Sequence, residues 1–269
     1  MYNLQSDEKS VQLWSLKHLQ HEKLGCEMRP KLSSVIRRLE PQASQILLCE
    51  HSTVNPIKAD IENVLIYNVR EASFARSSRN GIMFRLTQSL PKPSPDGEFY
   101  DHLSEYSFTE APERPDSPLI EFDLDKMRNP FDIWWAATAA KPVEMPQVVG
   151  NFELYVELWV PESLKNPGGK IKKVFDGIIA SMHADLKPSE EAIEILAEKH
   201  MVDKREIYDR LSAPPNPLIS FDANRRLVKP YRQNVQWHPD DGRCVSGTLI
   251  MKQSSVAKCV VSLRSIPSV

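Results

Sequence analysis

The chain has 269 residues, of which 41% are hydrophobic and 26% are charged, and these proportions indicate a globular protein with a buried core. The 34 basic and 36 acidic side chains give a net charge of −2. This near balance argues against a protein that binds nucleic acid through an overall basic charge, so any such contact would need a local basic patch.

The first 90 residues predict a mixture of helix and strand. Residues 8–40 predict helices, because "VQLWSLKHLQ" and "LSSVIRRLE" place apolar residues three and four positions apart. Residues 63–69 ("NVLIYNV") and 81–88 ("GIMFRLTQ") predict strands, since they are rich in β-branched and aromatic residues. Prolines then cluster at both ends of residues 90–118, which indicates a long ordered loop or a linker.

The next region begins with a short predicted strand, "PLIEFDL", and a helix in "NPFDIWWAATAA" that starts at Asn129 or Pro130. Residues 151–161 ("NFELYVELWVP") alternate between apolar and other residues, the strongest strand pattern in the chain. We expect one face of this strand to pack inward and the other to hold Glu153 and Glu157 in water.

A helix is predicted from Lys170 onward, and residues 187–216 predict two short helices with Ser189 as the N-cap of the first. Helix pairs of this size sometimes bind DNA, whereas an insertion packed on its parent domain is more common. The chain closes with "CVSGTLIMK" and "SVAKCVVSLRSI", which predict two strands paired with each other.

These elements predict an α+β fold with mixed or antiparallel sheets and packed helices. We expect an N-terminal α/β region over 1–90, a proline-rich linker or loop over 91–118, and an α+β domain over 119–269. The two-helix segment, about 187–216, would be an insertion in that domain.

Two adjacent carboxylates, Asp240 and Asp241, follow an apolar and aromatic segment in "VQWHPDDGRC". Because like charges repel, water, a metal ion or a turn that favours Asp must offset their repulsion. A strand points neighbouring side chains to opposite faces, so only one of the pair could face Lys172. Lys172 and Asp176 are four residues apart on the predicted helix and project from one face. A surface ion pair is the alternative explanation for them.

The order of these features resembles that of the RusA-type Holliday-junction resolvases. "NPGGKIKKVFD" resembles the family's helix, with Lys172 at the position of its lysine and Asp176 at that of the following aspartate. "HPDDGRCVSGTLIMK" resembles the family's downstream acidic pair and strand, with Asp240 and Asp241 as the pair. The resemblance covers about residues 150–186 and 233–253. It implies a RusA-like C-terminal half in which these four residues are catalytic.

The chain departs from the family where the first acidic residues are expected. Those two positions fall on Asn166 and Gly168, and the family's asparagine falls on Gly169. Phosphodiester hydrolysis of this kind needs several carboxylates to hold Mg²⁺, which prefers oxygen ligands and often acts in pairs. The C-terminal half therefore looks degraded as a nuclease.

The N-terminal region contains the missing spacing. Asp60, Glu62 and Asn63 form the pattern D-x-E-N, although Ile66 and Arg70 stand where the family has its lysine and aspartate. Because RusA-type resolvases act as dimers, a fused pseudo-dimer with complementary remnants would combine the two parts. A turn whose side chains bond the local backbone is the alternative.

A basic segment, "ANRRLVKPYRQ", precedes the acidic pair. Basic residues interleaved with an aromatic one can follow a phosphate backbone and stack on a base, whereas a solvated loop is the alternative. The candidate nucleic-acid-binding residues are Arg225, Arg226, Lys229, Tyr231 and Arg232.

The missing acids and the near-neutral charge favour a divergent RusA-like protein that is a non-catalytic, nucleic-acid-associated binding or scaffold subunit. Its partners would be DNA or RNA and other proteins of a larger assembly. The alternative is a Mg²⁺-dependent endonuclease acting on branched or structured nucleic acid, with Lys172 stabilising charge on the phosphate. The metal ligands would then be Asp60, Glu62, Asp240 and Asp241.

The cysteines, the apolar stretches and the first residues of the chain indicate where the protein is located. The four cysteines form no CxxC pair, which argues against a zinc site and a disulfide framework. No stretch approaches the roughly 18 apolar residues of a membrane span. The first residues, "MYNLQSDEKS", lack the pattern of a signal peptide. We therefore expect a cytoplasmic protein without membrane contact.

Overall fold

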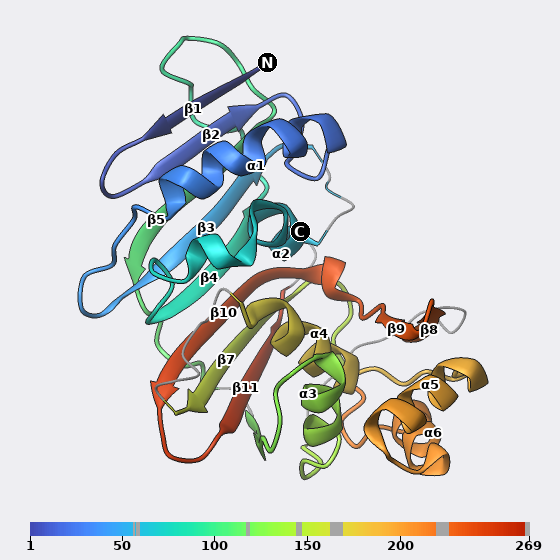
Figure 1. Cartoon of the computed structure of the whole chain (residues 1–269). Helices are drawn as coiled ribbons and strands as arrows, with labels where there is room; N and C mark the ends of the chain where they lie inside the picture. Colours follow the sequence, from blue (N-terminus) through green and yellow to red (C-terminus); the bar gives the residue numbers. More distant parts are fainter. Residues whose placement is uncertain are drawn as a thin grey trace.

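A mixed sheet runs through the whole molecule (Figure 1). The computed structural model describes residues 1–55, 57, 60–116, 119–143, 147–161, 169–218 and 226–266. Within these residues, nine strands form one sheet in the order β1-β2-β5-β3-β4-β10-β7-β11-β6. Helices pack on this sheet, which confirms the predicted α+β class. None of the helices in the described ranges is long and apolar enough to cross a membrane.

The N-terminal half contributes one side of the sheet. Its elements are β1 (Tyr2–Ser6), β2 (Val11–Ser15), α1 (Glu22–Ile36), β3 (Gln45–Thr53), α2 (Ile61–Leu65), η1 (Tyr67–Val69), η2 (Glu71–Phe74), β4 (Gly81–Thr87) and β5 (His102–Glu110).

The C-terminal half contributes the other side. Its elements are β6 (Leu119–Asp123), α3 (Pro130–Ala137), β7 (Phe152–Val160), α4 (Ile171–Ser181), α5 (Glu190–His200), α6 (Lys204–Ser212), β8 (Val228–Tyr231), β9 (Asn234–Trp237), η4 (Asp241–Arg243), β10 (Cys244–Gln253) and β11 (Lys258–Ser265).

The two halves repeat one chain path. In the first, β2-α1-β3-α2-β4-β5 forms a sheet segment ordered β2-β5-β3-β4, and in the second, β6-α3-β7-α4-β10-β11 forms one ordered β6-β11-β7-β10. In each half one neighbouring pair is parallel, β3 with β4 and β7 with β10, and the others are antiparallel. The halves join where β4 pairs antiparallel with β10. The connectivity is therefore that of an internal duplication, although the sequence shows no clear tandem repeat.

The helices place one apolar core across this junction. Buried residues of α1, α2 and α4 pack with residues of the sheet in a single cluster, and Figure 1 shows these helices on one face of the sheet. Phe84 of β4 and Phe175 of α4 meet with ring centroids 5.3 Å apart. They lie over Gly247 of β10, where an added Cβ would be 2.3 Å from the Phe175 ring. A residue without a side chain is therefore needed there.

The position of α4 is also fixed by α3. A Cβ added at Gly177 would be 2.6 Å from Cβ of Ile133 and 2.7 Å from the carbonyl oxygen of Pro130. The two helix backbones can approach this closely only because residue 177 has no side chain. The start of α4 is thereby held at the junction of the halves.

The segment between α4 and β10 contains the two helices predicted for residues 187–216, α5 and α6, and also the β8–β9 hairpin. Helices α5 and α6 and the β8–β9 hairpin share a second apolar core with α3. The side chain of Ser189 caps α5 by accepting a hydrogen bond from the backbone N–H of Ala192. Trp134 of α3 contacts Trp237 of β9, with ring centroids 5.5 Å apart. The insertion is therefore packed on its parent fold, beside the start of α4.

Two local predictions for the N-terminal half are wrong. Residues 11–15, predicted as helix, form β2 between β1 and β5, while the helix predicted further along is α1. Residues 63–69, predicted as a strand, form most of α2 and all of η1. In both cases the pairing and packing of the surrounding elements override local propensity.

Three further features differ from expectation. Residues 102–110 form β5, a strand within the segment predicted as a loop or linker. Strands β10 and β11 do not pair with each other, because β7 lies between them. Glu157 is buried rather than in water, and it forms ion pairs with Arg114 at 3.8 Å and Lys252 at 3.7 Å. The strands β4, β6 and β7 and the start of α3 agree with the predictions.

Candidate functional site

A pocket of about 660 Å³ opens at the junction of the two halves, and we call it the central cleft. The segment entering α2, the first turns of α4, the strand β9 and the turn before β10 all line it. Its charged residues come from both halves and are Asp60, Lys172, Asp176 and Asp241. Lys172 on α4 and Asp241 in the turn before β10 therefore line the same cleft.

Lys172 stands between carboxylates of different halves. Its Nζ lies 3.3 Å from Oδ1 of Asp176 on α4 and 3.6 Å from Oε2 of Glu62 on α2. Burial alone would lower the pKa of Lys172, but Glu62 and Asp176 raise it above its ordinary value. The lysine is therefore a fixed positive charge at the centre of the cluster.

Glu62 and Asp176 are the carboxylates closest to this charge. Only 6% of Glu62 is exposed, and its Oε1 is buried without a hydrogen-bond partner among the described residues. Burial raises the pKa of Glu62 to about 8, against the opposing effect of Lys172. Burial likewise raises the pKa of Asp176 to about 6. Both groups therefore retain protons at a pH where exposed carboxyls have lost them.

Asp60 and Asp241 connect the two halves directly. Their carboxyls share a hydrogen bond, and burial, followed by the charges of Asp60 and Asp176, raises the pKa of Asp241. Nδ2 of Asn63 donates a 2.6 Å hydrogen bond to Oδ2 of Asp60 and so orients that carboxylate. A Cβ added at Gly242 would be 3.3 Å from Oδ1 of Asp60, so the turn before β10 passes close to this group. The D-x-E-N segment is therefore part of the cluster.

The structure separates the adjacent pair Asp240 and Asp241, although not by strand alternation, because Asp241 begins the 3-10 helix η4 and Asp240 precedes it. Oδ2 of Asp240 accepts a 3.1 Å hydrogen bond from the guanidinium of Arg243, and its backbone N–H donates to Nε2 of His183. Asp240 does not line the central cleft, whereas Asp241 does. Asp240 therefore stabilises the turn. Asn166 and Gly168, where the resemblance expects acids, lie outside the described residues.

The cluster holds an ammonium in this arrangement. Across the part of the chain that the structure describes, no three His, Cys, Asp or Glu side chains are arranged to hold a metal ion. The donor set nevertheless suits Mg²⁺, because it consists of oxygen ligands. The unpartnered Oε1 of Glu62 is a buried oxygen that such an ion would satisfy. Asp60, Glu62 and Asp241 thus offer the type of donor atom that Mg²⁺ prefers, but in this arrangement they surround the ammonium of Lys172.

The basic segment forms a hairpin rather than a loop. Strands β8 and β9 pair around a tight turn in which Arg232 has a φ of 56°. Arg226, Lys229, Tyr231 and Arg232 are exposed, and Arg225 lies outside the described residues. The end of β9 forms part of the wall of the central cleft, whereas the four exposed residues of the basic segment do not line it.

Other residues of the cleft were not among the sequence candidates. They include Gln20, Tyr67, Gln236 and Trp237. Tyr67 lies in a segment predicted as a strand, where an aromatic residue is ordinary, so no local signal separates it. Trp237 lies three residues before Asp240 in the sequence. Its place in the cleft depends on the packing of β9 against α3, which the sequence does not show.

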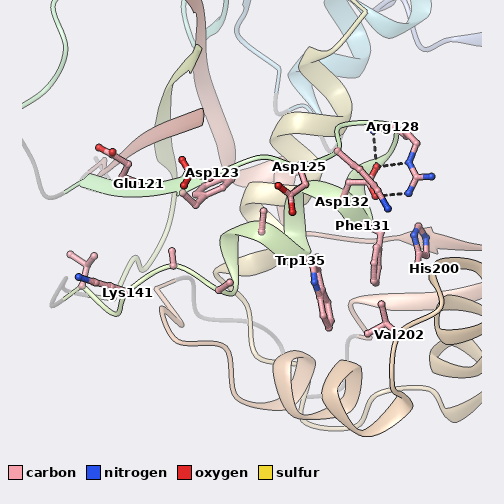
Figure 2. Close-up of a pocket in the computed structure, with 16 residues that line it drawn as sticks. Glu121, Asp123, Asp125, Arg128, Phe131, Asp132, Trp135, Lys141, His200 and Val202 are labelled. Atoms are coloured by element: carbon pink, nitrogen blue, oxygen red, sulfur yellow. Dashed lines mark hydrogen bonds and ion pairs between the residues drawn. The ribbon is translucent and has the colours of Figure 1, made fainter. Parts of the chain in front are cut away.

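A second pocket, of about 870 Å³, lies between β6, α3 and the end of α5 (Figure 2). Phe131, Trp135 and His200 line one side, with the rings of Phe131 and His200 stacked at 3.8 Å. Burial raises the pKa of Asp132, but the hydrogen bonds from Arg128 lower it by more, to below its usual value. Figure 2 shows these two side chains facing each other. Because its most buried carboxylate, Asp132, is ion-paired with Arg128, this pocket is a weaker candidate for an active site than the central cleft.

Comparisons with protein-family models, with curated proteins and with solved structures give no match. The candidate site therefore stands on the geometry and chemistry of its own residues.

Proposed function

We propose that the central cleft is the active site of a Mg²⁺-dependent endonuclease that acts on branched or structured nucleic acid. The observation that carries this proposal is the convergence of Asp60, Glu62, Asp176 and Asp241 on the single ammonium of Lys172. Burying several carboxylates around one lysine is costly for folding and a weak device for stability. Buried acids with raised pKa values in a cleft are, by contrast, typical of functional sites.

The position of the N-terminal acids supports catalysis over binding alone. The sequence favours a non-catalytic subunit because Asn166 and Gly168 replace two expected acids. Asp60 and Glu62 supply two carboxylates to the same cluster from the other half of the chain. The resemblance to RusA-type resolvases over parts of the C-terminal half supports the same reaction class.

Each residue of the cluster has a role in this proposal. Mg²⁺ held by Asp60, Glu62 and Asp241 would neutralise phosphate charge and lower the pKa of an attacking water molecule. Asn63 orients Asp60 through their hydrogen bond. Asp176 holds the ammonium of Lys172 in place. Lys172 stabilises the negative charge that develops on the phosphate oxygens.

The test is cleavage of branched, single-stranded and duplex DNA and RNA by the purified full chain, with Mg²⁺, with Mn²⁺ and with chelator. We expect metal-dependent cleavage that is lost in Asp241→Asn and kept in Asp240→Asn, a matched variant at the neighbouring position. Cleavage that is unchanged in Asp241→Asn, or no cleavage of any substrate, would contradict the proposal.

A nucleic-acid-associated binding or scaffold subunit is the second candidate function. The ion pairs of Lys172 with Glu62 and Asp176 favour it, because they offset part of the negative charge of the cluster without a metal ion. The basic β8–β9 hairpin would supply the phosphate contacts. Salt-sensitive binding without cleavage, in the same set of assays, would support this function over the first.

A further inference from the structure

An exposed aromatic ring stands beside the buried charges of the central cleft. Tyr67, at the start of η1, lines the cleft and is 55% exposed. Nζ of Lys172 lies 5.9 Å from the centroid of the Tyr67 ring. A phosphate bound at Lys172 would therefore lie close enough to the Tyr67 ring for the base of the same or the next nucleotide to reach it.

The rest of the cleft offers groups that recognise the edges of bases. Gln20 and Gln236 carry exposed amides that line the cleft, and amides can donate to and accept from a base edge. Trp237, on the same strand as Gln236, packs on Trp134 and so holds that wall in place. The cleft thus combines an exposed ring and two amides with the ammonium of Lys172 and the carboxyls of Asp60, Asp176 and Asp241, which would hold the metal ion of the proposed function or that ammonium.

A stacking surface of this kind discriminates between forms of nucleic acid. In a duplex the faces of the bases are covered by their neighbours, whereas an unpaired base offers a free face to an aromatic side chain. A tyrosine ring beside Lys172 is therefore suited to an unpaired nucleotide and not to a base-paired one.

Building on the proposed function, we propose that Tyr67 is a stacking platform for an unpaired base, so that the substrate of the central cleft is a single-stranded stretch of nucleic acid. In a branched substrate, the unpaired segment enters the cleft and the base beside the bound phosphate stacks on Tyr67. Tyr67 is a specificity-determining residue in this arrangement, because it contacts the substrate next to the reacting group.

Binding of short single strands and of the matching duplex, in chelator so that no cleavage occurs, tests this inference. We expect Tyr67→Ala to weaken single-strand binding by about tenfold, the loss typical of one base stack. Tyr67→Phe, which keeps the ring, retains the affinity. A 2-aminopurine in the strand reports the same loss as reduced fluorescence quenching. Duplex binding is unchanged in all variants.

Tyr208→Ala is the matched control, since Tyr208 is 46% exposed on α6 and does not line the cleft. Unchanged single-strand binding in Tyr67→Ala, or an equal loss for single strand and duplex, overturns the stacking role. Selective loss in Tyr67→Ala without any metal-dependent cleavage supports the stacking role and contradicts the proposed catalysis. Cleavage that depends on Asp241, together with normal single-strand binding in Tyr67→Ala, supports the proposed catalysis and contradicts the stacking role.

Discussion

Glu62 and Lys172 are the second residues of α2 and α4, and they form an ion pair of 3.6 Å across the junction of the two halves. The two helices take corresponding places in the repeated chain path, α2 between β3 and β4 and α4 between β7 and β10. Opposite charges attract at this junction, where identical residues would repel. A fused pseudo-dimer, one of the alternatives raised by the sequence, agrees with this arrangement.

Glu62→Gln is expected to stabilise the protein at alkaline pH. The pKa of Glu62 is about 8 in the folded state against an ordinary value of 4.5, so the folded protein keeps a proton that the unfolded chain loses. Stability therefore falls as pH rises through this window, and glutamine removes the effect. We expect a gain of about 1–3 kcal/mol near the upper end of the window and little change near its lower end.

Urea unfolding of both proteins at the two ends of the window measures this difference. Glu8→Gln, at an exposed site, is the control and should change the free energy of unfolding by less than about 0.5 kcal/mol. A Glu62→Gln protein that is less stable than the wild type at alkaline pH would mean that the carboxylate is well compensated.

Lys172→Met is expected to have the opposite effect on stability. It leaves Glu62 and Asp176 buried without their ion-pair partner, which typically costs about 3 kcal/mol or more. The loss should be largest at alkaline pH, where those carboxyls would be charged, and smaller in acid, where they bind protons. Thermal unfolding across this pH range measures it, with Lys173→Met as the neighbouring control. Equal losses in the two variants would show that the ammonium of Lys172 does not stabilise the buried carboxylates.

The β8–β9 hairpin should contribute phosphate contacts and not base recognition. Replacing Arg226, Lys229 and Arg232 by glutamine should weaken binding to all sequences alike. It should also reduce the slope of log affinity against log salt by about 0.7 for each lost contact with a single strand. A salt titration of binding measures the slope. The control replaces exposed cations elsewhere, Arg37 and Arg38. An unchanged slope in the hairpin variant would remove the hairpin from the interface.

His51 should make the N-terminal half sensitive to acid. Burial, followed by the charges of His102 and His18, lowers the pKa of His51 to about 3 from its ordinary 6.5. Because the unfolded chain binds this proton first, stability falls as pH drops below 6.5, by up to about 1.4 kcal/mol per pH unit. His51→Gln should flatten this dependence in a series of melting curves, whereas His21→Gln, at an exposed site, should not. Parallel curves for wild type and His51→Gln would show that His51 is not the group responsible.

The sequence predicts the elements whose own pattern is strong and misses those set by their neighbours. The strand β7 and the apolar face of α4 are visible in the residues themselves and both form, although Glu157 on the second face of β7 is buried and not in water. The residues of β2 predict a helix, because the pairing of this strand with β1 and β5 is long-range and leaves no local signal. The repeat of the two halves lies in the order of strand pairing, which leaves no clear trace in residue identity.

The sequence predicts the residues of the candidate site as two separate groups, and only the fold brings the groups together. The sequence singles out four residues in one half, Lys172, Asp176, Asp240 and Asp241, and two in the other, Asp60 and Glu62. It cannot show that α2 and α4 meet, because that depends on β4 pairing with β10. Tyr67 was missed for a different reason: its segment reads as a strand, and a tyrosine in a strand needs no functional explanation.

A titration of the full chain with Mn²⁺, followed by the loss of its free-ion electron paramagnetic resonance signal, tests most directly whether both halves build one metal site. We expect saturable binding that Glu62→Gln from the N-terminal half and Asp241→Asn from the C-terminal half each weaken by about tenfold or more, as loss of a ligand should, while Asp240→Asn binds like the wild type. Mn²⁺ binding that is indifferent to Glu62→Gln, or no binding at all, would contradict a shared site.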